Sequence, residues 1–531
     1  MDEVPSNRLI NPKVLSGDPG PPRITPEDAR YEDLALRVRN ERFEHRPRYF
    51  RVPRTTEQVV TAVTEAVRAG DRITIRSGGH SMENSVGEAS DGVIIDLSAM
   101  NGVYHDPGRR AFVVESGATL GEIYRVLYLT WGVTIPGGWG HSVCVGGHIQ
   151  GGGYGVLSRS LGSVVDYLFA VEVVVVDADG TARAVIATRD PADPHHELWW
   201  AHTGGGGGNF GVVTRYWLRS AVTPGDDPAQ LLPPPPATLL TGVRRWTWDG
   251  LTRDAFHQLM DNHGRWHQAN SSPGCRYAAL ASRLVVTGRG DQEDGEAVVV
   301  AAMIDGGLPD ARRMLADYLD EVGDGVGGEQ HIGQATPWLY TMMPPVPDGD
   351  AHRGAEYDRY KGKAGYLRRG FTRQQIDTVY DYLTSPRAGV ELARLWLLAY
   401  GGQINAVDPA ATALAQRDSV LKAVYIAIWS DAADDAENLD WMRRFYRDVY
   451  AETGGVPVPG EVHDGTYINY PDTDLADPAW NTSGVPWHYL YYKDNYERLR
   501  RVKRDWDPRD VFRHALSVRP ADPPGEPAPT P

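Results

Sequence analysis

Three short glycine clusters, each next to a β-strand pattern, constrain the fold of this chain more than any other feature. Many of its 58 glycines fall in RSGGHS (76–81), PGGWGHSVCVGGHIQGGGYGVLSR (136–159) and WWAHTGGGGGNFGVVT (199–214). Bulky apolar residues are interleaved with these glycines, which a solvated linker would not need. Glycine lets a backbone turn sharply and approach a ligand closely, and the N–H groups of such turns suit phosphate oxygens. Taken alone, RSGGHS also fits a plain tight turn, but the three clusters together predict one large, phosphate-bearing cofactor.

Two common nucleotide-binding patterns and a metal site are disfavoured. RSGGHS is not followed by the Gly-Lys-Ser/Thr of a P-loop, and no GxGxxG stands in a compact βαβ unit with a downstream acid. His141, Cys144 and His148 have plausible spacing for metal ligands, but they lack a fourth ligand and supporting hydrogen-bond partners. We therefore expect no bound metal.

Composition narrows the classes of partner. The chain has 54 Lys and Arg against 70 Asp and Glu, a net charge of −16, which argues against nucleic acid or an anionic membrane. It has no apolar run of about 18 residues, and its first residues lack the pattern of a secretory signal. The two cysteines, Cys144 and Cys275, cannot form a disulfide framework. We expect a cytoplasmic enzyme or binding protein, either a monomer or a homo-oligomer.

Local patterns predict a mixed α+β fold with two domains. Helical spacing of apolar residues predicts a helix over 56–69, and two β-rich runs around Asp179-Gly180 predict a hairpin over 170–185. Four prolines at 233–236 mark a domain boundary, and beyond them helices alternate with apolar strands, which predicts an antiparallel sheet covered by helices. The predicted division is an extended lead-in (1–30), a first domain (31–225), a substrate domain (237–455), a segment that returns to the first domain (456–520) and a disordered tail (521–531).

Four motifs in order carry a resemblance to a known family. RSGGHS, PGGxGxxVxVGGHxxGGGYGxLSR, HHxLWWAxxGGGGGNFGVVT and YxNYPD resemble the berberine-bridge-enzyme-like branch of covalent flavoproteins, in the vanillyl-alcohol-oxidase (PCMH) superfamily. Within it the chain is most similar to actinobacterial tailoring oxidases of antibiotic biosynthesis, including oxidases of a glycopeptide hexose. The resemblance implies FAD as cofactor, a PCMH-type FAD-binding domain and a second α+β substrate domain.

The resemblance also implies which residues contact the flavin. His80 matches the histidine that bonds the flavin 8α-methyl, and the remaining positions come from the same motifs. These predicted cofactor contacts are Arg76, Ser77, Gly78, Gly79, Ser81, Gly140, Val143, Cys144, Gly146, Gly147, His148, Gly151, Gly152, Gly153, Gly207, Gly208, Asn209, Val212, Asn469 and Tyr470.

One departure from the family concerns the second covalent link. Bicovalent relatives carry a flavin-linking cysteine where this chain has Gly140, and its own Cys144 lies four residues later. A thiol displaced by four residues should not reach the same flavin carbon without a rearranged loop. We predict one link, through His80, with a linked Cys144 as the alternative.

The implied chemistry is oxidation of a hydroxyl group on a sugar or a natural-product scaffold, by hydride transfer to covalent flavin that O₂ reoxidises to H₂O₂. Tyr467 and Tyr154 match a tyrosine pair in related active sites, and we expect Tyr467 to act as base with a hydrogen bond from Tyr154. Oxidative cyclisation or dehydrogenation of an aglycone is the alternative, and a non-catalytic flavoprotein that sequesters a metabolite is a third hypothesis. For Lys361 and Lys363 we favour a solvated face over substrate contact.

Overall fold

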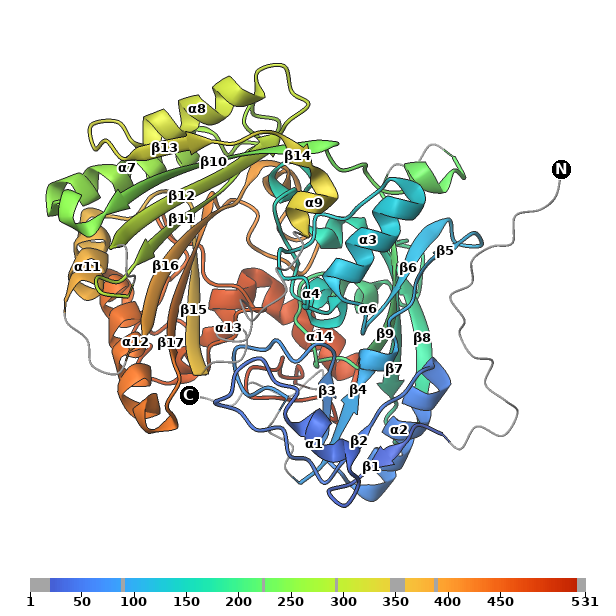
Figure 1. The fold of residues 1–531 in the computed structure, drawn as a ribbon. Helices are drawn as coiled ribbons and strands as arrows, with labels where there is room; N and C mark the ends of the chain where they lie inside the picture. The colour runs from blue at the N-terminus through green and yellow to red at the C-terminus, as the bar shows by residue number, and fades with distance from the viewer. Residues whose placement is uncertain are drawn as a thin grey trace.

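The computed structural model of the chain describes residues 20–86, 91–221, 225–291, 295–343, 359–385 and 390–522. Residues 1–19 of the predicted lead-in and 523–531 of the predicted tail lie outside these ranges. The described chain contains three β-sheets with helices packed between and around them (Figure 1), which confirms the predicted α+β class. None of the helices in these ranges is long and apolar enough to cross a membrane.

Two sheets form the N-terminal half. The first sheet and its helices comprise β1 (Arg23–Ile24), α1 (Arg30–Ala35), β2 (Tyr49–Arg51), α2 (Thr56–Ala69), β3 (Ile73–Arg76) and β4 (Val93–Asp96). The second comprises β5 (Val103–Asp106), β6 (Ala111–Glu115), α3 (Leu120–Trp131), α4 (Val145–Gln150), α5 (Ser158–Leu161), β7 (Leu168–Val176), β8 (Ala182–Thr188), α6 (His196–Ala201) and β9 (Val212–Leu218). The strand orders are β1-β2-β4-β3, with β2, β4 and β3 parallel, and β5-β6-β9-β7-β8, antiparallel throughout.

Local sequence accounts for the two predicted elements of this half. At the start of α2, the Thr55 side chain accepts a hydrogen bond from the backbone N–H of Gln58, a cap that stabilises a helix by about 1 kcal/mol. Gly70, with a φ of 68°, ends the helix in the left-handed conformation that glycine adopts readily. Strands β7 and β8 pair antiparallel on either side of the Asp-Gly turn. The predicted helix and hairpin are both confirmed.

A large eight-stranded sheet dominates the second half. This half comprises β10 (Thr238–Thr247), α7 (Arg253–Ala269), β11 (Ala281–Thr287), β12 (Glu296–Asp305), α8 (Ala311–Val322), β13 (Glu329–Ile332), β14 (Thr336–Pro337), α9 (Trp338–Met342), β15 (Arg359–Leu367), α11 (Arg373–Thr384), β16 (Leu392–Ala399), β17 (Leu421–Trp429), α12 (Asp435–Val449), α13 (Trp487–Tyr492) and α14 (Tyr496–Trp506). Short 3₁₀ turns occupy Leu97–Ala99, Val164–Tyr167, Pro228–Gln230, Trp248–Gly250, Gly402–Ala406, Ala432–Asp434, Ala451–Thr453, Thr473–Ala476 and Lys493–Asn495.

The large sheet is antiparallel and has two different faces. Its order is β13-β10-β12-β11-β16-β17-β15, with β14 paired to β10. Helices α7, α8, α11 and α12 cover one face, as Figure 1 shows on the outer side of the sheet. Along β17, Tyr425 packs on Phe445 of α12 with ring centroids 5.4 Å apart, so the alternate residues Lys422, Ile426 and Ile428 lie on the opposite face. The predicted helix-covered antiparallel sheet is confirmed.

The C-terminal segment contacts the N-terminal half. The Lys503 amine of α14 donates to the carbonyl of Asn209 at 2.8 Å, and the backbone N–H of Val518 donates to the Asn209 side chain, also at 2.8 Å. Phe512 forms a parallel bridge with Ile73 of β3. These contacts join the C-terminal segment to the third glycine cluster and to β3, the strand that leads into the first. The predicted domain boundaries themselves stay predictions.

Candidate active site

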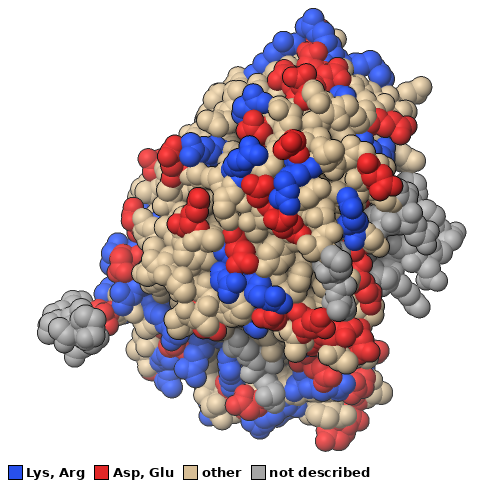
Figure 2. Space-filling view, turned by 90° about the vertical axis from the view of Figure 1, so that its left-hand side faces the viewer, with Lys and Arg blue, Asp and Glu red and all other residues tan. Residues whose placement is uncertain are grey.

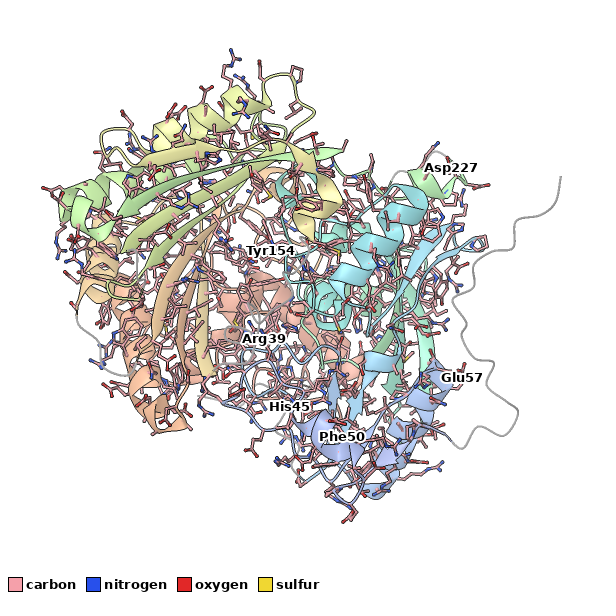
Figure 3. All side chains as sticks on the ribbon, viewed as in Figure 1. Arg39, His45, Phe50, Glu57, Tyr154 and Asp227 are labelled. Atoms are coloured by element: carbon pink, nitrogen blue, oxygen red, sulfur yellow. The ribbon has the colours of Figure 1, made fainter. Side chains whose placement is uncertain are left out.

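A cavity of about 830 Å³ lies between the N-terminal half and the uncovered face of the large sheet. All three glycine clusters line it on one side, and strands β11, β12, β16 and β17 line it on the other. Tyr154 and Arg39, both labelled in Figure 3, lie between the two halves and line this cavity.

Close packing leaves no room for a side chain at several positions of the glycine loops. A Cβ atom on Gly78 would lie 3.0 Å from the Cys144 nitrogen, and one on Gly146 would lie 2.8 Å from the Ser116 carbonyl oxygen. Gly79 and Gly208 have φ angles of 73° and 74°, which a side chain would strain. Backbone therefore forms this wall of the cavity, as a large flat ligand with phosphate groups requires. The wall fits the FAD that the family resemblance implies.

Most of the predicted cofactor positions line the cavity. Both predicted catalytic tyrosines, Tyr154 and Tyr467, also line it. The lining positions are Ser77, Gly78, Gly79, His80, Ser81, Gly140, Val143, Cys144, Gly146, Gly147, His148, Gly207, Gly208, Asn469 and Tyr470.

The other predicted positions lie behind the lining: Arg76, Gly151, Gly152, Gly153, Asn209 and Val212. Arg76 is fully buried and donates from Nε to Asp96 at 2.6 Å. A Cβ atom on Gly151 would lie 2.1 Å from the Asn469 side chain, so this glycine makes room for Asn469 and does not face the cavity. Val212 belongs to an apolar core shared with the first sheet.

Five tyrosines surround one buried lysine at the cavity wall. We call this group the tyrosine cage; the distances from the Lys422 amine to the ring centroids are 3.4 Å for Tyr154, 3.5 Å for Tyr467, 4.4 Å for Tyr366, 5.3 Å for Tyr400 and 5.5 Å for Tyr470. Within the part of the chain that the structure describes, this amine has no hydrogen-bond partner. Ring faces attract a cation, so the cage supplies the stabilisation that is otherwise absent. Sequence reasoning missed Lys422, although a single lysine inside the apolar run of β17 was a signal.

The hydrogen bonds of the tyrosine pair differ from those expected. The Tyr154 hydroxyl lies 3.3 Å from the Tyr470 hydroxyl, and its ring meets Tyr467 edge-on with centroids 5.6 Å apart. The Tyr467 hydroxyl instead accepts from Asn469 Nδ2 at 2.9 Å and donates to the Gly152 carbonyl at 3.3 Å. The expected bond from Tyr154 to Tyr467 is wrong, because Tyr154 is directed toward Tyr470. Asn469 is the residue that can stabilise a charged Tyr467.

Burial determines the electrostatics of the cage. It raises the pKa of Tyr154 and of Tyr467 well above the usual value, and it lowers the pKa of Lys422 well below its usual value. Burial, and then the Lys422 charge, lower the pKa of His148 to about 4. Neutral His148 accepts a hydrogen bond at Nε2 from the backbone N–H of Gly138 at 3.1 Å.

Cys144 is a buried cysteine in the cavity lining. Burial raises its pKa to about 11, and its Sγ donates to the Gly117 carbonyl at 3.2 Å. Thiolate is the nucleophilic form of cysteine, and a raised pKa disfavours it. Within the described ranges, no three His, Cys, Asp or Glu side chains gather as a metal site.

A buried ion cluster lies on the helix-covered side of β15. The Lys361 amine pairs with Glu83 and, at 2.9 Å, with Asp472; the Lys363 amine pairs with Asp472 at 2.6 Å and with Asp474 at 2.7 Å. The prediction of a solvated face for both lysines is wrong, since both are buried. Glu83 follows His80 by three residues and Asp472 follows Tyr470 by two, so the cluster joins two segments of the cavity lining.

The charges in this ion cluster support one another. Burial alone would lower the pKa of Lys361, but Asp472 and Glu83 outweigh it and raise that pKa. Burial alone would raise the pKa of Asp474, but Lys363 and Lys361 hold it well below its usual value. The i, i+2 spacing of the two lysines and of the two aspartates was a signal in the sequence.

Comparisons with known proteins agree with the cavity. A family model described as FAD binding domain matches residues 47–185, and one described as Berberine and berberine like matches residues 466–519. The chain is 50% identical over 498 residues to the aclacinomycin-N/aclacinomycin-A oxidase of Streptomyces galilaeus, covering 93% of this chain and 89% of that protein. It is 29% identical over 507 residues to a hexose oxidase of Chondrus crispus, covering 87% and 88%.

Two solved structures have the same fold. The crystal structure of a glycopeptide hexose oxidase complexed with teicoplanin matches with a TM-score of 0.89 and 50% identity, covering 94% of this chain and 99% of that one. That of aclacinomycin oxidoreductase matches with a TM-score of 0.90 and 50% identity, covering 94% and 100%.

Proposed function

Because the chain belongs to the berberine-bridge-enzyme-like family of FAD-binding oxidoreductases, we propose that it oxidises a hydroxyl group on a natural-product scaffold or on a sugar attached to one. Dioxygen is the final electron acceptor and hydrogen peroxide the second product. The tyrosine cage carries this proposal, since it brings a candidate base, Tyr467, to the cavity that fits the cofactor. Relatives named as oxidases of aclacinomycin and of a glycopeptide hexose support the class of substrate.

The glycine loops would hold FAD through their backbone, and His80 would be the attachment point. Bound FAD would take two electrons from the substrate carbon and pass them to dioxygen. We propose a single link through His80, because Gly140 has no sulfur and burial raises the pKa of the Cys144 thiol to about 11. Intact-mass analysis of denatured yellow protein should then find one FAD, on the His80 peptide alone. FAD on the Cys144 peptide would refute the single link.

Tyr467 takes the proton of the substrate hydroxyl in this proposal. A phenolate is needed for that step, although burial raises the pKa of Tyr467. Asn469 donates to its oxygen at 2.9 Å, and the Lys422 amine lies 3.5 Å from its ring centroid. Burial disfavours either charge alone, but an ammonium at Lys422 and a phenolate at Tyr467 offset each other's desolvation.

The decisive experiment measures peroxide from the FAD-loaded enzyme and its variants with aclacinomycin A, teicoplanin and simple hexoses. Tyr467→Phe should lower kcat by about 10²- to 10⁴-fold with flavin content unchanged, since it removes the base. The matched control is Tyr382→Phe, on α11 beyond the cage, where the hydroxyl meets Asp448 at 2.6 Å. Full activity in Tyr467→Phe would refute the assigned base. Absence of flavin from folded wild-type protein would refute the function.

A further inference from the structure

The cavity has an unusual charge composition for this chain. Its described lining contains four arginines and neither Asp nor Glu, in a protein with 70 acidic residues and a net charge of −16. Acidic and basic side chains are mixed over the outer face in Figure 2, so the contrast belongs to the cavity. Arg39 and Arg513 lie with the glycine loops and β3, where they suit the phosphates of the cofactor. Arg283 and Arg394 lie across the cavity from these loops.

Arg283 and Arg394 belong to the sheet wall of the cavity. Arg283 on β11 pairs with Leu398 on β16, and Leu398 pairs with Lys422 on β17. Paired residues of antiparallel strands share a face, so Arg283 lies two strands from Lys422, about 10 Å between Cα atoms. Arg394, four residues from Leu398 on the same strand, shares that face. Arg283 is therefore two strands from Lys422, and Arg394 is four residues along β16 from the residue that pairs with Lys422.

Neither arginine forms a salt bridge within the described residues. The Arg283 guanidinium lies 5.7 Å from the ring centroid of Trp396, and the buried Nε of Arg394 has no hydrogen-bond partner there. The Arg283 side chain is exposed to solvent in the cavity, and partial desolvation and then the neighbouring Arg394 lower its pKa.

Burial lowers the pKa of Arg394, and Asp291 and Glu296 oppose that effect without a salt bridge to it among the described residues. The Asp291 carboxylate accepts from the backbone N–H of the neighbouring Ala393 at 2.8 Å. Arg283 has no such carboxylate among the causes of its shift, so an anion placed beside it would offset the repulsion from Arg394.

The sheet wall that carries the two arginines is otherwise largely apolar, with Trp396 and Leu398 between Arg394 and the residue row of Lys422. Its other apolar lining residues are Leu392, Ile426, Ile428 and Met303. A flat apolar surface of this kind packs well against a planar ring system. A guanidinium presents a planar fork of donors that matches a carboxylate.

We propose that Arg283 and Arg394 form a subsite for an anionic group, a carboxylate or phenolate, on the aromatic scaffold that carries the oxidised hydroxyl. This inference takes its substrate class from the proposed function, but binding at the subsite can be measured without turnover. The anion lies between the two guanidinium groups, the rings lie on Trp396, and the hydroxyl reaches the tyrosine cage.

The test is binding to the FAD-loaded enzyme of two probes of equal shape, 2-naphthoate and neutral 2-naphthamide. Titration followed by calorimetry should give a Kd roughly 10- to 100-fold lower for the acid, and this preference should shrink as salt rises. Arg283→Met and Arg394→Met should each remove most of the preference, and Arg283→Glu should reverse it. The matched control is Arg289→Met, just beyond β11 and outside the cavity lining.

Equal affinity of the two probes for the wild type, or an unchanged preference in both Met variants, would overturn the proposal. Loss of FAD from these variants would also overturn it, since the arginines would then serve the cofactor. If no hydroxyl compound yields peroxide while the wild type keeps its preference and the variants lose it, the proposed oxidase function fails and the anion subsite stands.

Discussion

Lys422 on β17 and the pair Lys361 and Lys363 on β15 are lysines of the same sheet, with exposed fractions of 0%, 1% and 2%. They lie on opposite faces of the sheet, and their amines have different surroundings. In the buried ion cluster each amine meets carboxylates at hydrogen-bond distance. In the tyrosine cage the Lys422 amine contacts ring faces. Within the described residues it has no hydrogen-bond partner.

The comparison distinguishes a buried lysine that joins segments of the fold from one whose charge can change. A paired amine keeps its proton and joins segments far apart in the chain, here the loop after His80 and the segment after Tyr470. An amine held only by ring faces has a lowered pKa, so small changes at a neighbouring phenol alter its charge. Such a group costs the fold stability, and strongly shifted groups of this kind cluster at functional sites.

Breaking the ion cluster should have the largest effect on stability. Lys361→Met leaves Glu83 and Asp472 without that partner, and we expect the free energy of unfolding to fall by about 3–5 kcal/mol. Urea unfolding of the FAD-loaded protein measures it. The control is Arg444→Met on α12, which removes an exposed pair with Asp440 and should change stability by at most about 0.5 kcal/mol. Equal effects of the two variants would contradict the distinction between buried and exposed pairs.

Removing the cage lysine should have a smaller effect, of opposite sign. Lys422→Met replaces a buried amine without a hydrogen-bond partner by an apolar chain, so the free energy of unfolding should rise by about 1–2 kcal/mol, net of the lost ring contacts. Turnover should fall because the charge on Tyr467 loses its counter-ion. Urea unfolding and peroxide assays measure the two effects. Ile426→Met, on the same face of the same strand, is the control for unfolding and should leave the free energy of unfolding nearly unchanged. Tyr382→Phe, beyond the cage, is the control for turnover.

The pH dependence of stability distinguishes the two environments further. The folded pKa of Lys422 lies below its unfolded value of about 10.4, so the unfolded state binds more protons between the two values. Wild-type stability should therefore rise with pH through that window, and Lys422→Met should lack this slope. Lys361 has a raised folded pKa, so its contribution is present at neutral pH and is lost only as pH rises above about 10.4. A decrease in wild-type minus Lys422→Met stability with rising pH would contradict the lowered pKa.

Much of the fold follows from local sequence. The Thr55 cap and Gly70 define α2, and the Asp-Gly turn defines the β7–β8 hairpin, each within a few residues. Apolar strands alternating with amphipathic helices were enough to predict the helix-covered large sheet. These features depend on spacing along the chain, which a sequence displays directly.

The candidate site was predictable where a motif carried it and not where distant residues meet. The glycine clusters were expected to line one cavity, and residues from all three do so. The partners of Lys361 were missed because Glu83 is 278 residues away in sequence. Tyr154 and Tyr470, 316 residues apart, form a contact that replaced the expected one with Tyr467. By contrast, Asn469 lies two residues from Tyr467, and local reasoning could have found that hydrogen bond.

The glycine loops and the candidate base lie far apart in the chain. The glycine loops all precede residue 215, whereas Tyr467, Asn469 and the Lys503 contact to Asn209 belong to the last part of the chain. A ribosome therefore releases the cofactor-facing loops long before the residues that complete the tyrosine cage. A nascent or truncated chain that stops short of residue 466 contains these loops but lacks Tyr467 and Asn469.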